Sequence, residues 1–351
     1  MENTDLPVLE NIKTLHKYDT IYSADSVEWC PHEPNQNLFV CGNYQLTEEQ
    51  EFNSNNKRLG RILLFTLTTD LKLLQTLDTA AVLDQKWCPN QINGSSILGV
   101  VNAKRALEIY KLQNSFLVLV TKYTFLEDQS TETLILSLDW STGKTESQHP
   151  HVACSDSKGN IHLLQLINNE LVMEKSWHGH DFQAWITGFY YWDPNIIFSG
   201  GDDAVFLKFD KRAGDSPVAK NKQHETGVTS FHSNKSKEFL VATGSYDEHV
   251  RLWDVRSIKN PLNQLKMPGG VWRLKWDPFS QRYLLAACMF GGLHVMEAQS
   301  DKMVILDSYY EHKNITYGAD WSFLNCNGNV IIGSCSFYDH LLCVSNFTCD
   351  F

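Results

Sequence analysis

The sequence predicts a single all-β domain, a seven-bladed β-propeller closed into a ring, and three observations lead to this prediction. Short runs of alternating apolar and polar residues recur along the chain in groups of three, with turn residues between them. The groups repeat every 40–45 residues or so, roughly the length of one blade of the WD-repeat type. Helical periodicity is nearly absent, so the 351 residues fit one radial repeat fold better than several mixed domains.

The clearest repeat is the segment 224–256. Its three β-runs, at 228–232, 239–244 and 249–253, end in the dipeptide Trp253-Asp254 that closes a WD blade. A typical WD blade also holds a buried hydrogen-bonded set of four side chains, since a buried polar group must be paired. The residues expected to form this set are His224, Ser245, Asp247 and Trp253. Segment 180–212 has the same layout.

Weaker copies lie on both sides of this repeat, and five of them carry a tryptophan near the end of the first run. These tryptophans are Trp29, Trp87, Trp140, Trp276 and Trp321. The expected blades are 22–77, 81–126, 133–178, 180–222, 224–267, 269–312 and 314–351. The last one lacks a fourth strand, and we expect the spare segment 11–18 to supply it, because this closure removes an open sheet edge. The polar stretch 44–58 is expected to be an exposed loop in the first blade.

Composition excludes several classes of function. The net charge of −11 and the lack of a basic patch argue against nucleic acid as a partner. Nine cysteines, an odd number with no C-x-x-C spacing, indicate reduced thiols rather than a disulfide framework or a zinc ribbon. No signal peptide and no apolar stretch of membrane-spanning length are recognisable, so we expect a cytoplasmic monomer that does not contact a membrane.

Common catalytic motifs are missing. The sequence has no G-x-S-x-G elbow, Walker loop, G-x-G-x-x-G or H-E-x-x-H motif. Two H-x-H pairs, His149/His151 and His178/His180, come without a cysteine or carboxylate that would complete a zinc set. The sequence therefore predicts neither a metal nor a cofactor.

The amino-acid sequences of the last four blades contain motifs that are more specific than blade geometry requires. The distinctive motifs are HDFQAWI (180–186), SGGDD (199–203), GSYDEHVR (244–251), GGVWRLKW (269–276), YGADW (317–321) and CSFYDH (335–340). Together they resemble the diphthine methyl ester hydrolases, the WD-repeat enzymes of diphthamide biosynthesis. The resemblance covers roughly 178–343 closely. It implies hydrolysis of the methyl ester of methylated diphthine, a modified histidine of translation elongation factor 2, which leaves diphthine.

That substrate carries a quaternary trimethylammonium group beside the ester, and aromatic faces and carboxylates hold such a cation best. In WD propellers the connections before the inner strands share one face with those between the second and third strands, and the motifs cluster there. We therefore expect a funnel for the substrate on this face. Its candidate residues are Trp185, Asp202, Trp272, Arg273, Tyr317, Asp320, Phe337, Tyr338 and Asp339. The alternative is that these aromatic residues only pack between blades.

Ester hydrolysis also needs an activated nucleophile, and two schemes are open. In one, His180 or Asp203 activates water; in the other, Cys335 or Ser336 attacks the ester with His340 as base. Each has a structural alternative, because His180 and Asp203 also match the buried blade set and Cys335 matches a packed strand thiol. A charged residue inside GGVWRLKW needs a partner, so Arg273 is expected to stabilise an oxyanion or to pair with an acid.

A rival hypothesis assigns no chemistry to the propeller. The tetrapeptide Trp253–Arg256 fits the W-D-x-R box of WD-repeat substrate receptors in cullin-RING ubiquitin ligases. In this case Arg256 would dock a ubiquitin-ligase adaptor. A plain assembly scaffold is the third alternative.

Overall fold

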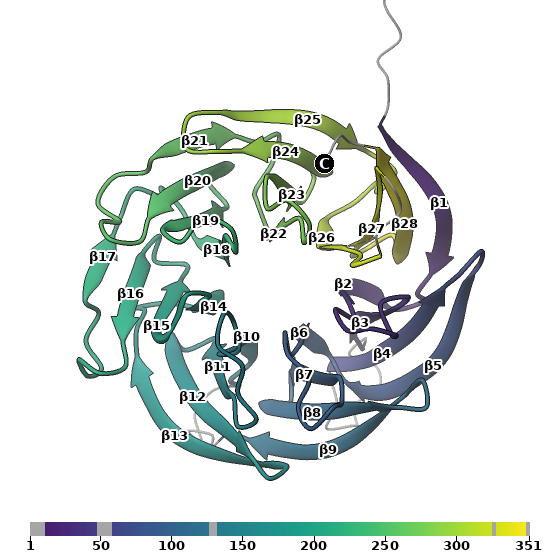
Figure 1. Ribbon diagram of the computed structural model, residues 1–351, viewed down its shortest axis with the longest axis horizontal. Helices are drawn as coiled ribbons and strands as arrows, with labels where there is room; N and C mark the ends of the chain where they lie inside the picture. Colours follow the sequence, from purple (N-terminus) through teal and green to yellow (C-terminus); the bar gives the residue numbers. More distant parts are fainter. Residues whose placement is uncertain (1–10, 48–57, 126–131, 325–327, 349–351) are drawn as a thin grey trace, which may run out of the picture.

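A computed structural model describes residues 11–47, 58–125, 132–324 and 328–348 of the chain. The described residues form seven four-stranded antiparallel sheets arranged radially around a central channel (Figure 1). The predicted seven-bladed propeller is thus confirmed. Residues 48–57 of the predicted loop 44–58 lie outside the described residues. The two ends of the predicted loop are strand instead, because β-structure continues to Leu46 and resumes at Arg58.

Six blades follow the chain order from the channel outwards. Blade one holds β2 (Ser23–Trp29), β3 (Leu38–Leu46), β4 (Arg58–Leu67) and β5 (Leu71–Ala80), and blade two holds β6 (Val82–Trp87), β7 (Ile97–Asn102), β8 (Ala106–Gln113) and β9 (Phe116–Thr124). Blade three holds β10 (Ile135–Trp140), β11 (His151–Asp156), β12 (Asn160–Ile167) and β13 (Glu170–His178), and blade four holds β14 (Ile186–Tyr190), β15 (Asp193–Gly200), β16 (Phe206–Asp210) and β17 (Ala219–Asn221). Blade five holds β18 (Val228–Ser233), β19 (Leu240–Ser245), β20 (His249–Asp254) and β21 (Asn263–Lys266), and blade six holds β22 (Arg273–Trp276), β23 (Tyr283–Ala287), β24 (Leu293–Ala298) and β25 (Met303–Tyr309).

Blade seven is closed by both ends of the chain. It consists of β26 (Thr316–Trp321), β27 (Asn329–Ser336), β28 (Leu341–Thr348) and, outermost, β1 (Ile12–Asp19). β1 pairs antiparallel with β28, as the sequence predicted. The Asp307 carboxylate of blade six accepts hydrogen bonds from the backbone N–H groups of Asn11 and Ile12 at 2.6 and 2.8 Å. The N-terminal strand therefore holds blades six and seven together.

The recurring inner-strand tryptophans join neighbouring blades. Trp87 Nε1 donates to the carbonyl of Glu28 in blade one at 3.1 Å, and Trp140 Nε1 donates to the carbonyl of Lys86 in blade two at 3.0 Å. Trp321 Nε1 donates in the same way to the carbonyl of Lys275, at 2.8 Å. Each of these indoles also fills the apolar layer between two sheets, so the repeat that identified the fold also closes it.

The buried set of blade five differs in one member from the prediction. His224 Nδ1 lies 3.0 Å from the Asp247 carboxylate, and His224 Nε2 lies 2.8 Å from the hydroxyl of Thr243, which also accepts from Trp253 Nε1 at 2.8 Å. Ser245 was the wrong hydroxyl: it sits at the end of β19, where its Oγ accepts from the Asp247 N–H of the following turn at 3.0 Å. Thr243 lies two residues further into the strand, between the two rings.

Candidate functional site

The two ends of the channel differ in chemistry. We call the end at which the inner strands begin the upper face and the end at which they finish the lower face. On the upper face, the connections that precede inner strands are hydrogen-bonded to the connections between second and third strands. Asp202 N–H donates to the Gln183 carbonyl at 2.8 Å, and Phe337 N–H donates to the Ile315 carbonyl at 2.9 Å. The motif residues of both kinds of loop therefore gather there.

A row of aromatic rings surrounds much of the upper channel mouth. The ring of Trp272 lies 5.6 Å from that of Trp185 and stacks on that of Tyr317 at 4.8 Å. Phe337 continues the row at 5.4 Å from Tyr317 and contacts Tyr338 at 5.0 Å. We call these five side chains the aromatic row; all but the exposed Tyr338 are half-buried. The structure brings together all the aromatic candidates from the sequence, and Tyr246 and Tyr44 extend the row at either end.

Next to Tyr317 lies a buried charged cluster that the sequence indicated only through Arg273. Arg273 Nη2 pairs with Asp84 Oδ1 at 3.1 Å, and the other oxygen of Asp84 accepts from the Leu138 N–H at 3.1 Å. Asp25 is the third member and is 6% exposed. It occupies a bulge of β2, where the pairing register with β3 shifts between Ala24 and Ser26.

The carboxyl of Asp25, on the upper face, has an unusually high pKa. Burial, only partly offset by the Arg273 guanidinium, raises the pKa of Asp25 to about 8, and the neighbouring Asp84 adds to the rise. Within the described part of the chain this carboxyl makes no ion pair. A carboxyl that changes protonation near neutral pH suits general acid–base chemistry.

His180 and Asp203, the candidates of the first scheme, belong to a buried hydrogen-bonded set within their blade. His180 is 1% exposed; its Nδ1 lies 3.0 Å from Asp203 Oδ1 and its Nε2 lies 2.7 Å from Ser199 Oγ. This arrangement repeats that of His224, Asp247 and Thr243 in blade five.

Asp202, the residue before Asp203, is exposed. It accepts a hydrogen bond from Trp185 Nε1 at 3.0 Å, which fixes that indole at the channel mouth.

The candidates of the second scheme, Cys335, Ser336 and His340, do not come together as a nucleophile and its base. Cys335 is fully buried, and burial, with the nearby Cys41, raises the pKa of the Cys335 thiol well above its usual range, which disfavours the thiolate. Ser336 Oγ lies 2.9 Å from His312 Nδ1 and donates to Asp339, so His312 rather than His340 is its imidazole partner. His340 occupies a turn position with φ of 53° and binds Thr20 through its backbone carbonyl.

One predicted funnel residue belongs to the lower face. Asp320 lies at the opposite end of the channel from the aromatic row, where it accepts a hydrogen bond from the Trp29 N–H at 2.8 Å. The prediction placed it with Tyr317 because both belong to YGADW. β26 runs the length of the channel, however, so residues three apart along it reach different ends.

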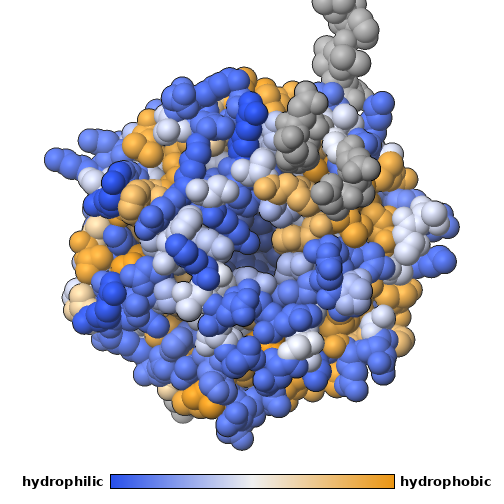
Figure 2. Space-filling model, in the orientation of Figure 1, coloured by the Kyte–Doolittle hydropathy of each residue, from blue (hydrophilic) through white to orange (hydrophobic). Residues whose placement is uncertain are grey.

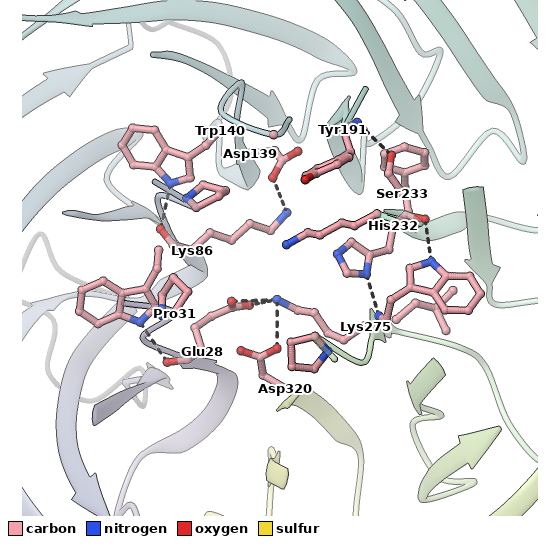
Figure 3. A pocket seen from close by; sticks show the side chains of 18 of the residues that line it. Glu28, Pro31, Lys86, Asp139, Trp140, Tyr191, His232, Ser233, Lys275 and Asp320 are labelled. Atoms are coloured by element: carbon pink, nitrogen blue, oxygen red, sulfur yellow. Dashed lines mark hydrogen bonds and ion pairs between the residues drawn. The ribbon is translucent and has the colours of Figure 1, made fainter. Parts of the chain in front are cut away.

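The lower end holds a ring of charges that sequence reasoning missed. Figure 2 shows one face of the molecule, hollowed at the channel and bordered mainly by hydrophilic residues. In Figure 3, side chains from several blades point into a pocket at this end. Five of them immediately precede the inner-strand tryptophans, and we call these the lower ring: Glu28, Lys86, Asp139, Lys275 and Asp320. Their position before each tryptophan is the signal that could have revealed them.

Opposite charges of the lower ring pair across blades. Lys275 Nζ contacts both oxygens of Glu28, at 2.6 and 2.8 Å, and lies 3.7 Å from Asp320, while Lys86 lies 3.4 Å from Asp139. Burial outweighs the Lys275 ammonium and raises the pKa of Glu28 to about 7. Among residues 11–47, 58–125, 132–324 and 328–348 no group of three His, Cys, Asp or Glu side chains could hold a metal ion. Nor does any helix in these ranges have the length and apolarity to cross a membrane.

Comparison with known proteins gives one family and one fold. The family model described as "WD domain, G-beta repeat" matches residues 215–254 of this chain. "Diphthine methyltransferase" of Mus musculus is 39% identical over 89% of this chain and 70% of its own length. "Diphthine methyltransferase homolog" of Dictyostelium discoideum is 35% identical over 96% of this chain and 98% of its own length.

More distant matches share less of the chain. "DDB1- and CUL4-associated factor 11 homolog" of Caenorhabditis elegans is 25% identical over 46% of this chain and 31% of its own length. A chain of the solved structure "Crystal Structure of Mitotic Checkpoint Complex" superposes with a TM-score of 0.74 at 16% identity, over 100% of this chain and 97% of that one. At this identity the likeness establishes the propeller fold alone.

Proposed function

Because the chain belongs to the diphthine methyltransferase family of WD-repeat proteins, we propose that it is a cytoplasmic enzyme of diphthamide biosynthesis and acts on translation elongation factor 2. Within that pathway we assign it the hydrolysis of the methyl ester of methylated diphthine. The name of its relatives describes methyl transfer instead, so the direction of the reaction is the point that needs support.

One observation carries the proposal: the aromatic row lies beside a buried carboxyl with a pKa near neutrality. The rings of Trp185, Trp272 and Tyr317 offer the faces that hold a trimethylammonium group. Burial and the nearby Asp25 carboxyl raise the pKa of Tyr317, and Arg273 is in turn a neighbour of Asp25. An ester next to a cation held by the row would therefore lie close to both groups. Methyl transfer has no use for a base that activates water, whereas hydrolysis requires one.

The assigned step follows from these groups. The ionised carboxylate of Asp25 takes a proton from water while the water oxygen bonds to the ester carbonyl carbon. Arg273 stabilises the negative charge that develops on the carbonyl oxygen. When the tetrahedral intermediate collapses, the C–O bond to the methoxy group breaks and Asp25 returns the proton to it. The products are diphthine, with a free carboxyl group, and methanol.

A mass-spectrometric assay tests the proposal. The purified chain is incubated with elongation factor 2 that carries methylated diphthine, and the modified peptide is expected to lose the mass of one CH₂ group. Trp272→Ala should lower kcat/KM by at least about tenfold, because it removes the central ring of the row. The matched control is Trp192→Ala; Trp192 lies on the lower side, with Lys144 over its ring, and should have little effect. No mass loss with a competent substrate would refute the hydrolase.

The ubiquitin-ligase hypothesis has less support. Arg256 is held in its own blade, since its guanidinium pairs with Asp254 and lies 4.1 Å from the centre of the Phe239 ring. The adaptor reading thus rests on the tetrapeptide and on relatives that share under half of the chain. A pull-down of the adaptor that depends on Arg256, together with an unchanged substrate mass, would favour it.

A further inference from the structure

The pocket at the lower end of the channel extends inwards as far as Arg273, but its remaining lining residues have no part in the proposed ester hydrolysis. It has a volume of about 360 Å³ and takes side chains from all the inner strands described (Figure 3). A cavity of this size would hold a small ligand. Its walls combine the lower ring with polar residues at the end of β18 and just after it, among them His232, Ser233 and Lys235.

Lys235 differs from the other lysines of the pocket. Lys86 and Lys275 each have a carboxylate partner. Lys235 makes no ion pair within the described residues, and its Nζ lies 5.7 Å from the centre of the Tyr191 ring. Lys235 is an exposed residue, yet the pocket walls around its ammonium and the nearby Lys275 lower the pKa of Lys235, although Asp320 and Asp139 oppose this. A positive charge crowded by other ammonium groups would gain from an added anion.

His232 contributes a hydrogen-bond donor. The backbone N–H of Trp276 donates to His232 Nδ1 at 2.8 Å, so this nitrogen carries no proton and the neutral ring bears its proton on Nε2. Burial, with the surrounding Lys275 and Lys235, lowers the pKa of His232 well below its usual range and keeps the ring neutral. In Figure 3 the imidazole points into the pocket, and Nε2 has no partner among the described residues.

The carboxylates of the pocket do not cancel this positive character. Glu28 and Asp320 share the Lys275 ammonium, and Asp139 is occupied by Lys86 and by the Phe189 N–H at 2.7 Å. These carboxylates therefore already have donors, whereas Lys235 Nζ and His232 Nε2 have no acceptor among the described residues. We propose that the lower cavity is a binding site for a small oxyanion, a phosphate or carboxylate group, held by Lys235 Nζ and His232 Nε2.

Calorimetric titration with inorganic phosphate, and in a second arm with acetate, tests this site at constant ionic strength. The two arms show which oxyanion the cavity prefers. We expect saturable binding of at least one anion by the full chain, weakened about tenfold or more by Lys235→Met, which removes a charged donor. The matched control is Lys237→Met on the same turn, because Lys237 Nζ binds Gln299 Oε1 at 2.7 Å outside the pocket. This variant should bind within about twofold of the unmodified chain.

A second measurement follows the unmodified chain and uses one variant to assign the signal. In imidazole ¹⁵N spectra of the unmodified chain, the saturating anion should shift one Nε2–H signal, which His232→Gln removes. Absence of saturable binding of either anion would overturn the proposal, as would equal weakening by both lysine substitutions. Neither result bears on ester hydrolysis, so failure of this site and failure of the proposed enzyme are distinguishable.

Discussion

At the scale of single residues, Asp25 is the side chain on which the proposed chemistry depends. We predict that Asp25→Asn lowers kcat/KM by about 10²–10⁴, the range typical of a lost general base. In the unmodified chain, kcat/KM should rise with pH around a midpoint near 8, because burial raises the pKa of Asp25 to about 8 and only the ionised form accepts a proton. A pH–rate profile of methyl ester loss checks both points. Equal activity of the two chains would show that another group activates the water.

The same residue makes a prediction about stability. Burial favours the protonated form of Asp25 in the folded chain, so the folded state binds a proton that the unfolded state has already released between about pH 4 and 8. Stability is therefore lost as the pH rises through this window. Asp25→Asn should melt at a higher temperature than the unmodified chain at pH 9, and the difference should vanish near pH 4. A variant that melts lower at pH 9 would contradict this account.

Thr243 tests the corrected blade set. Thr243→Val keeps the shape of the side chain but leaves His224 Nε2 and Trp253 Nε1 buried without a partner, which costs about 1–3 kcal/mol for each group. Ser245→Ala should cost less, because the Asp247 N–H and the Thr226 carbonyl that it frees are only partly buried. Urea unfolding of both variants measures the difference. A larger loss for Ser245→Ala would restore the set predicted from the sequence.

At the scale of elements, β1 is the strand that closes the ring. Ile12 is 4% exposed and packs in the cluster between blades six and seven, whereas Leu15 on the same strand is 46% exposed. We predict that Ile12→Ala lowers the free energy of unfolding by about 2–5 kcal/mol, the usual cost of truncating a buried isoleucine. Leu15→Ala is the matched control and should cost less than about 0.5 kcal/mol. Equal effects in urea unfolding would mean that β1 does not secure the ring.

Sequence reasoning was also most successful for the secondary-structure elements. Alternation and the recurring tryptophans predicted the blades and the closing strand at 11–18, because both patterns follow directly from strand geometry and from inter-blade packing. The motifs of the loops predicted the aromatic row. Asp25 could not be found in this way, since its burial depends on a bulge in β2 and on residues from two other blades. Asp320 was misplaced because a motif conceals which end of a strand each residue reaches.

At the scale of the whole molecule, the lower ring ties together blades that are distant in sequence. Lys275 of blade six pairs with Glu28 of blade one and lies near Asp320 of blade seven. Lys275→Met would leave two buried carboxylates without their cation, which costs about 3–5 kcal/mol when a buried pair is broken. The loss should shrink as the pH falls, because protonation removes the uncompensated charges.

The matched control for this prediction is Lys266→Met. Lys266 is 69% exposed and lies 3.4 Å from Glu248, and a surface pair of this kind contributes about 0–1 kcal/mol. Thermal unfolding of both variants at neutral and acid pH makes the comparison. Equal melting temperatures of the two variants would show that the lower ring does not hold the propeller closed.

The direction of the methyl chemistry is tested most directly by the fate of water oxygen. The full chain is incubated with methylated-diphthine elongation factor 2 in ¹⁸O-enriched water, and the modified peptide and the released methanol are analysed by mass spectrometry. Attack of water on the ester carbonyl predicts that the product carboxyl gains one ¹⁸O while the methanol keeps ¹⁶O. A peptide that keeps its methyl group, or labelled methanol beside an unlabelled carboxyl, would contradict the proposed hydrolysis.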